Sequence, residues 1–380
     1  MEFAFTKDQL MFKKEVIRFA RKEILPRVEE NDRNHTFDFE AFRKMGEFGL
    51  LGLHLPEAYG GAEADVVTTV LAGEALGEAG VDGGLTLSYG AHSFLCADTL
   101  FCHGTEAQRQ TYLPDLISGE KIGCMGLTEP SAGSDVASMK TTAIKQGDTY
   151  VLNGSKTFIT NGPIADVALI YAKTDPEKAH DGISAFIVEK GTPGFESGPP
   201  MNKLGCRSSQ TSELFFSDCA IPAKNLVGEE GTGFLMAMQT VEWDRSALLS
   251  PMVGGINHAL ARSVAYAKGR EQFGRPIGTF YATKEKLASI KIFAEAAKLL
   301  VYRIAWCKGQ GKPVNHLEAA VAKLFVGDWL LGPSNDALLL HGGYGYCHEY
   351  GVERMFRDGR LAPIGGGTSD VQKMIISKMI

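Results

Sequence analysis

The chain has 380 residues, of which 44% are hydrophobic and 22% are charged, and its formal net charge is −6. This composition is typical of a soluble globular protein with two or three domains. The acidic balance and the lack of a basic stripe argue against nucleic acid as a partner, and no apolar run is long enough for a membrane span. The seven cysteines form no CxxC pair and the nine histidines form no HExxH cluster, so we expect reduced thiols and no metal site.

The first residues, MEFAFTKDQLMFKKEV, begin directly on an amphipathic helical pattern. They contain neither the apolar core of a secretory signal nor the acid-poor composition of a transit peptide. We therefore expect a cytoplasmic protein of bacterial type, or a protein of the mitochondrial matrix if a transit peptide has been removed.

Residues 1–120 show helical periodicity throughout. The stretch DQLMFKKEVIRFARKEI (8–24) places its apolar residues on one stripe with lysine and arginine between them. A second amphipathic piece, EAQRQTYLPDLISGE, follows at 106–120, and LPEAYGGAEAD (55–65) is a glycine-rich loop between helices. The pattern predicts an N-terminal helical domain.

Residues 121–230 change to a period of two, with frequent turn signals. TYVLNGSKTFIT reads as a hairpin in which Asn153-Gly154 fills a two-residue turn. ADVALIYAKT, GISAFIVEK and SELFFSDCAIP continue as strands, separated by glycine and proline. We expect an antiparallel β domain of sandwich or barrel type, because no helices alternate with the strands.

Residues 231–380 are helical again, in longer pieces. The stretch from Gly233 to Phe273 can form one long helix, which Pro251 should kink. Two further amphipathic stretches, 284–307 and 315–343, follow with short joins. Their length and pairing predict a C-terminal four-helix bundle, so the overall fold class is α+β with the order all-α, antiparallel β, all-α.

Three stretches carry the residue types of a ligand site. GLTEPSAGSD (126–135) is dense in hydroxyls and glycine, which suits an anion or a ring but equally an ordinary polar turn. FITNG (158–162) pairs an aromatic with a threonine, as stacking on a flat heterocycle requires. GREQFGRPIG (269–278) ends a helix with two arginines, which can serve phosphates or simply complement the helix dipole. No strand–GxGxxG–helix fingerprint is present, so a dinucleotide would not be held in the Rossmann manner.

The order and spacing of these stretches resemble the acyl-CoA dehydrogenase family along essentially the whole chain. The resemblance also includes MNKLGCRSSQTSELFF, HGGYGYCHEYGVERMFRD and the terminal GGGTSDVQ. Within the family, LSYGAHSFLC and TEPSAGSD look most like the isovaleryl-CoA dehydrogenase branch. The resemblance implies non-covalent FAD, an acyl-CoA substrate, a homotetramer built as a dimer of dimers, and electron transfer to an electron-transfer flavoprotein.

The resemblance also implies which positions contact FAD. Arg270 matches an arginine that reaches the pyrophosphate from the neighbouring subunit. Tyr281 and Leu339 depart from the family, which often has glutamines there that contact the cofactor. The matching positions are Met125, Gly126, Leu127, Thr128, Ser134, Phe158, Ile159, Thr160, Arg270, Gly342, Gly343, Thr368 and Asp370.

The catalytic base is not where many family members carry it. That position, in the terminal loop, is Gly366 here. The isovaleryl and long-chain branches place the base just before an arginine on a long helix, and the matching residue is Asp244, 29 residues before Phe273. Glu242 is the rival, although it matches a position beside the CoA arm. Residues two apart on a helix point about 200° apart, so only one can face the flavin. Alternatively, Asp244 is only an ion-pair partner or an acid that favours the helix start.

The expected substrate follows from the terminal glycines. Straight-chain members commonly carry a bulky aromatic at the position of Gly365, so its absence favours a short branched or alicyclic acyl group. We expect the substrate to contact Ser134, Glu242, Arg245, Gly365, Gly366 and Ala91.

Three hypotheses remain for the function. The first is oxidation of such an acyl-CoA to the enoyl-CoA, as in fatty, branched-chain or alicyclic acid degradation, with Asp244 as base. The second is a flavoenzyme on the same scaffold with altered regiochemistry, for example 1,4-elimination on a conjugated acyl-CoA, or an enoyl-CoA reductase. The third is a relative that binds flavin or CoA without catalysis. Retention of Arg270, Thr160 and the TEPSAGSD loop argues against the third.

Overall fold

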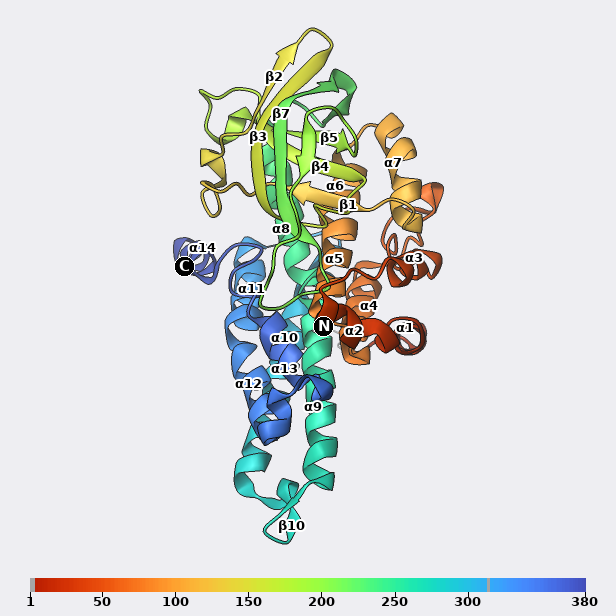
Figure 1. Ribbon diagram of the computed structural model, residues 1–380, viewed down its shortest axis with the longest axis vertical. Coiled ribbons are helices and arrows are strands. Elements are labelled where there is room, and N and C mark those ends of the chain that lie inside the picture. Colours follow the sequence, from red (N-terminus) through yellow and green to blue (C-terminus); the bar gives the residue numbers. More distant parts are fainter. Residues whose placement is uncertain (1–3, 313–314) are drawn as a thin grey trace.

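The computed structural model describes residues 4–312 and 315–380, and the side chains of residues 241–244 lie outside that description. Helices, a β-sheet and a second set of helices follow one another along the chain (Figure 1), which confirms the predicted α–β–α order. The N-terminal helices lie against one side of the sheet and of the bundle. They are α1 (Lys7–Glu23), α2 (Leu25–Asn34), α3 (Phe39–Glu47), α4 (Val66–Ala79), α5 (Gly83–Gly90), α6 (Asp98–His103) and α7 (Glu106–Ser118), with a π-helical turn, Ala91–Ala97, between α5 and α6.

Within the described residues, eight strands form one sheet in the order β6-β7-β3-β2-β4-β5-β8, and β1 pairs in parallel with β4. Strand β4 contributes alternate residues to two cores. Leu169 and Tyr171 pack with the helices, whereas Ala168 and Ile170 pack with β3 and β7 inside the folded sheet. The strands are β1 (Gly123–Gly126), β2 (Thr142–Gln146), β3 (Thr149–Thr160), β4 (Val167–Lys173), β5 (Ile183–Glu189), β6 (Phe195–Ser197), β7 (Thr211–Pro222) and β8 (Leu226–Val227).

The hairpin predicted at Asn153-Gly154 is wrong. Strand β3 runs through both residues without turning, and the turn lies earlier, between β2 and β3, where Gly147 has a φ of +60°. Asn153-Gly154 instead lies at an irregularity in the β3–β7 pairing, where Leu152 faces Cys219 and Gly154 faces Phe216. Long-range pairing with β7 outweighs the local turn preference of Asn-Gly, which a bulge also accommodates.

The C-terminal helices form an elongated bundle that extends away from the sheet (Figure 1). Two predicted long helices are divided. Pro251 lies in the first turn of α9, after a break at residues 248–249, so it begins a new helix where we expected a kink within one. The stretch 315–343 likewise forms two helices, α11 and α12. The bounds are α8 (Gly233–Ala247), α9 (Ser250–Gly269), α10 (Tyr281–Gly309), α11 (His316–Trp329), α12 (Leu331–Leu340), α13 (Val352–Gly359) and α14 (Ser369–Met379), with a short ribbon of β9 (Glu271–Gln272) and β10 (Arg275–Pro276).

Helices α4 and α9 join the N-terminal and C-terminal parts through very close backbone contact. A Cβ atom added at Gly77 would lie 2.0 Å from the carbonyl oxygen of Pro251, and one at Gly254 would lie 1.9 Å from that of Glu74. The side chain of Glu74 is fully buried there and pairs with Lys13 at 2.7 Å and with Lys298 at 2.9 Å. These contacts fix the bundle against α1 and α4, so α8 and the terminal loop have a rigid support.

No helix in the described part of the chain is long and apolar enough to cross a membrane. Across those same residues, no group of three or more His, Cys, Asp or Glu side chains is arranged to hold a metal ion. The seven cysteines are free thiols; Cys96, Cys124, Cys206 and Cys219 are buried.

Candidate active site

Two strands of the sheet bring the predicted flavin-binding stretches together. Strand β1 delivers Met125 and Gly126, and Leu127 and Thr128 follow it directly. The amide of Thr157 donates to the carbonyl of Thr128 at 2.9 Å, so the stretch after β1 lies beside the last residues of β3. The structure therefore places Met125–Thr128 beside Phe158, Ile159 and Thr160. We call these two stretches together the platform.

Phe158 is presented by a strained bulge in β3. Lys156 pairs with Leu214 and Ile159 pairs with Ser212, so two residues of β3 face one residue of β7. The φ of Phe158 is +58°, a region that non-glycine residues rarely occupy, and its side chain is 68% exposed. Ile159 points the other way and is buried. The bulge thus turns an aromatic ring outward beside Thr160, as stacking on a flat ring system requires.

A buried ion pair lies beneath the platform. The Nζ of Lys156 lies 2.7 Å from Oε1 of Glu129, and both side chains are almost completely buried. Lys156 also donates to the carbonyl of Leu127 at 3.4 Å, and the Glu129 carboxylate accepts from the amides of Lys140 and Thr141. Burial lowers the pKa of Lys156 to about 8, although Glu129 opposes the shift. The pair ties the TEPSAGSD loop to β3 and so fixes the platform.

The start of β1 is held by two buried polar side chains. Nδ1 of His92 accepts from the amide of Gly123 at 2.9 Å, and its Nε2 donates to the carbonyl of Leu116 at 2.8 Å. Burial lowers the pKa of His92 to about 4, so the ring is neutral and keeps this pattern at physiological pH. Asn161, with a φ of +66°, donates to the carbonyls of Ser88 and Gly123. These contacts bind the platform to the N-terminal helices.

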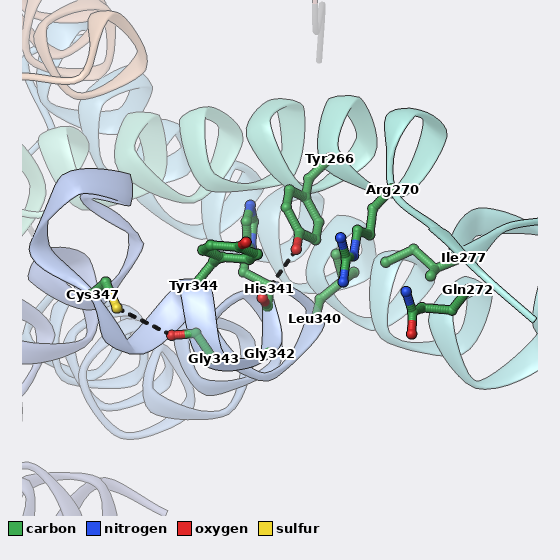
Figure 2. A pocket seen from close by; sticks show the side chains of 10 residues that line it. All are labelled: Tyr266, Arg270, Gln272, Ile277, Leu340, His341, Gly342, Gly343, Tyr344 and Cys347. Carbon is green, nitrogen blue, oxygen red and sulfur yellow. Dashed lines mark hydrogen bonds between the residues drawn. The ribbon is translucent and has the colours of Figure 1, made fainter.

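A second group of predicted cofactor residues lines a pocket at the far end of the bundle. Arg270, Gly342 and Gly343 meet there around a cavity of about 410 Å³ (Figure 2). The guanidinium of Arg270 lies over the ring of Tyr344, 5.9 Å from its centre. Gly342 has a φ of +60°, and nothing lies within 4 Å of a Cβ added at either glycine. A cation beside two open glycine backbones suits a diphosphate.

The two groups of residues lie apart along the length of the molecule. The sheet that carries the platform is at the top of Figure 1, whereas α9 ends near β10 at the bottom. Each end fits one part of FAD: an exposed aromatic and a threonine suit the flat ring, and Arg270 with the glycines suits the pyrophosphate. The two family departures, Tyr281 and Leu339, are 81% and 53% exposed.

The terminal loop, Gly365–Thr368, joins α13 to α14 near the base of the sheet. Gly366 and Gly367 have φ values of +64° and +88°, which favour glycine. Among the described residues, no acceptor binds the amides of Gly366 or Gly367. The hydroxyl of Thr368 caps α14 by accepting from the amide of Val371 at 3.3 Å, and Asp370 in the first turn of α14 is almost fully exposed.

Helix α8 passes between this loop and the sheet. Its backbone includes the candidate bases Asp244 and Glu242, but both side chains lie outside the described residues. The neighbouring Arg245 is 8% exposed, and one of its guanidinium nitrogens would lie 3.6 Å from a Cβ added at Gly367. Ala91 is buried at the start of the π-helical turn, which packs against α8. Ser134, in the loop after β1, is exposed.

Sequence reasoning missed several residues that hold these elements. Glu129 and Lys156 lie inside the quoted motifs, but their pairing joins positions 27 residues apart. Lys323 is 4% exposed on α11, and its Nζ donates to the carbonyl of Gly367 at 2.6 Å. Its signal was available: a lysine stands on the apolar face of a helix, among Ala319, Ala322 and Val326.

Known relatives cover the entire chain. Family models described as the N-terminal, middle and C-terminal domains of acyl-CoA dehydrogenase match residues 6–120, 124–219 and 231–380. The chain is 43% identical to a short-chain specific acyl-CoA dehydrogenase of Clostridium acetobutylicum, over 100% of both chains. It is 40% identical to an NADH-dependent acryloyl-CoA reductase of Anaerotignum propionicum, over 100% of this chain and 96% of that protein. It is also 40% identical to a mitochondrial isovaleryl-CoA dehydrogenase of rice, Oryza sativa, over 98% and 91%.

Solved structures agree with these relatives. Butyryl-CoA dehydrogenase from Megasphaera elsdenii superposes with a TM-score of 0.96 at 41% identity, covering 100% of this chain and 99% of that one. A structure described as PigA with FAD and proline superposes with a TM-score of 0.97 at 33% identity, over 100% and 99%. The identities to the short-chain and isovaleryl enzymes are similar, so they do not select a substrate. The chain belongs to the acyl-CoA dehydrogenase family, and it is an FAD-dependent oxidoreductase.

Proposed function

We propose that the protein oxidises a short branched-chain or alicyclic acyl-CoA to the corresponding enoyl-CoA, with Asp244 as the base. The observation that carries the proposal is the open terminal loop. Among the described residues, a Cβ atom added at Gly366 would meet nothing within 4 Å, and the atoms nearest to one at Gly365 belong to Leu361, at 3.7 Å. The loop therefore offers neither a carboxylate nor a bulky ring, and it leaves lateral room for a branch or a ring on the acyl group.

Each residue has a stated task in this proposal. Bound FAD supplies the acceptor for the hydride that leaves the β carbon. Asp244 removes the proton from the α carbon and keeps it on its carboxylate. The amide of Gly366 donates to the thioester carbonyl, which stabilises the negative charge that develops there as the proton leaves. Ala91 and Gly365 border the acyl group, and Ser134 and Glu242 lie along the CoA arm.

The length of the base leaves the regiochemistry as a second candidate. Asp is one methylene, about 1.5 Å, shorter than the usual Glu, and proton transfer depends on hydrogen-bond reach. Either the substrate lies closer to α8, or the proton comes from another carbon, as in 1,4-elimination. The identity to an acryloyl-CoA reductase supports a third outcome, in which the enzyme works as an enoyl-CoA reductase. Retention of the complete platform argues against a relative without catalysis.

The active protein should be a homotetramer, built as a dimer of dimers, that passes electrons to an electron-transfer flavoprotein. The separation of the platform from the Arg270 pocket along the molecule supports a shared site, in which a second copy supplies Arg270 to the FAD that lies on the platform. A solved structure described as an electron-transferring flavoprotein of Acidaminococcus fermentans is 43% identical to the chain. We expect the protein to work in the cytoplasm, or in the mitochondrial matrix if a transit peptide was removed.

The proposal is tested by anaerobic bleaching of the flavin with a panel of acyl-CoAs. Asp244→Asn should keep FAD and CoA affinity but slow bleaching by roughly 10²–10⁴, the usual contribution of a positioned base. Glu242→Gln should mainly raise KM. If Asp244→Asn retains the full rate while Glu242→Gln abolishes it, the two roles are exchanged. The mass of the product and the position of its double bond separate ordinary oxidation from the other two outcomes.

A further inference from the structure

Lys323 of α11 is a buried cation that donates a hydrogen bond to the backbone of the terminal loop. Its Nζ lies 2.6 Å from the carbonyl oxygen of Gly367, and the side chain is 4% exposed. Within the described part of the chain, Lys323 has no carboxylate within ion-pair distance, although Asp328 of the same helix acts on its charge from farther away. Placing an ammonium in such a position costs free energy, because burial removes its hydration and no direct ion pair replaces it. A neutral apolar residue would fill this position equally well, so packing does not explain the charge and a specific role is indicated.

The grip of Lys323 sets the direction of one peptide group. The carbonyl of Gly367 and the amide of Thr368 belong to the same planar trans peptide, so they point in opposite directions. A donor that holds the carbonyl toward α11 therefore turns the Thr368 amide away from α11. Gln372 donates to the same carbonyl at 3.2 Å, and a hydrogen bond between Ser369 and Asp328 of α11 holds the start of α14.

The amides of the two preceding peptide groups, those of Gly366 and Gly367, are also without an acceptor in the described part of the chain. Both glycines have left-handed φ values. Arg245 approaches the same loop from α8, and one of its guanidinium nitrogens would lie 3.6 Å from a Cβ added at Gly367. The charge of Lys323 contributes a positive potential at the place where the loop exposes its amides.

We propose that Lys323 is a positioning residue for acyl-CoA oxidation: it fixes the terminal loop so that its open amides face the thioester carbonyl, and its charge favours the anion that forms when the α proton leaves. The inference rests on the proposed function, since it assumes that the thioester lies against this loop. Lys323 exchanges no proton with the substrate. Its effect is exerted through the peptide that it holds and through its charge.

The experiment separates removal of the α proton from transfer of hydride. A 3-thia acyl-CoA has an acidic α proton but no hydrogen to give from its sulfur, so it stops after deprotonation. The anion beside oxidised FAD gives a long-wavelength charge-transfer absorption. In Lys323→Met we expect the FAD content to stay near that of the parent. The ionisation constant of the bound analogue, measured from its deprotonated fraction, should fall roughly 10- to 100-fold, the scale of a charged hydrogen bond. Lys323→Arg should restore most of it.

Lys286→Met is the matched control, because Lys286 also lies on a bundle helix but pairs with Asp336 at 3.2 Å and is partly exposed. That variant should ionise the analogue as the parent does. If Lys323→Met does not fold, Lys323→Gln carries the test, since it keeps a donor without charge and should show an intermediate loss. Full ionisation in Lys323→Met or in Lys323→Gln overturns the inference. If the parent itself fails to ionise any such analogue, the proposed function fails instead.

Discussion

Two buried lysines hold the two sides of the candidate site, and they do so differently. Lys156 lies under the platform and pairs with Glu129 at 2.7 Å. Lys323 lies under the terminal loop and holds a backbone carbonyl, with no ion pair in the described part. Burial lowers the pKa of both to about 8. The charge of the platform lysine is thus balanced by a directly bound carboxylate, whereas the loop lysine has no direct ion pair in the described part of the chain.

The difference matches what each side has to do. The platform has to keep a fixed shape for a ring system, and a neutralised pair inside the sheet provides shape without a strong local field. The loop adjoins the thioester in our proposal, where negative charge develops during the reaction. A cation without a direct ion pair costs stability there but favours that charge. Substitution of the first lysine should therefore affect folding, and substitution of the second should affect chemistry.

The largest expected effect is on stability, in Lys156→Met. The substitution leaves the buried Glu129 carboxylate without its cation, which should lower the free energy of unfolding by about 3–5 kcal/mol. Denaturant unfolding of the holoprotein measures the change. Lys145→Met is the control, because Lys145 is 58% exposed, lies 3.8 Å from Glu230 and should contribute no more than about 1 kcal/mol. If Lys323→Met unfolds as easily as Lys156→Met, the contrast between the two lysines is wrong.

The second-largest expected effect is on the affinity for FAD, through the part of the site that lies apart from the platform. Arg270→Ala removes the only cation that lines the pocket in Figure 2 among the described residues, so FAD affinity should fall by about 10- to 100-fold, the scale of a charged hydrogen bond. The loss should grow on dilution if the arginine acts across a subunit interface. Arg275→Ala is the control, since Arg275 stacks on Phe280 at 4.3 Å and does not line the pocket. Unchanged FAD retention in Arg270→Ala would mean that the platform alone holds the cofactor.

Gly365→Tyr tests the loop side of the comparison. A ring at this position should occupy the lateral space beside the reacting carbons, where the nearest described atoms belong to Leu361, at 3.7 Å. We expect kcat/KM for branched substrates to fall by an amount equivalent to about 1–3 kcal/mol of transition-state binding, with a smaller change for straight chains. Straight-chain substrates on the same variant serve as the internal control. A parent enzyme that already prefers long straight chains would contradict the substrate assignment.

The sequence predicted the order of the three parts, because that order depends on periodicity and local composition; the assignment of site residues stays a prediction. It failed at Asn153-Gly154, where pairing with β7 determines the course of the strand. It also failed to connect Glu129 with Lys156, since a contact between strand and loop depends on the folded sheet. The position of Lys323 on an apolar helix face was a readable anomaly, but its partner, a backbone carbonyl 44 residues later, was not.

The smallest effect is a pH dependence that separates the two lysines. As pH rises through about 8, Lys323 loses its proton, since burial and Arg245 of α8 lower its pKa while Asp328 of α11 opposes them. Lys373 of α14 lies 3.9 Å from Asp328, and Arg303 of α10 is paired with Glu318. A neutral amine holds the Gly367 carbonyl by about 1 kcal/mol less than an ammonium does, so the rate of flavin bleaching by bound acyl-CoA should fall several-fold above pH 8.

The stability of the fold, in contrast, should increase with pH while the reaction becomes slower. The unfolded chain binds more protons than the folded one between pH 8 and 10, because the folded-state pKa values of both lysines are lowered, so the free energy of unfolding rises with pH in that range. Lys323→Arg keeps its charge throughout and should remove the fall in bleaching rate that Lys323 causes. If the entire fall persists in Lys323→Arg, the loop is not held by the charge of Lys323, and the contrast between the two lysines fails at the site where it matters for catalysis.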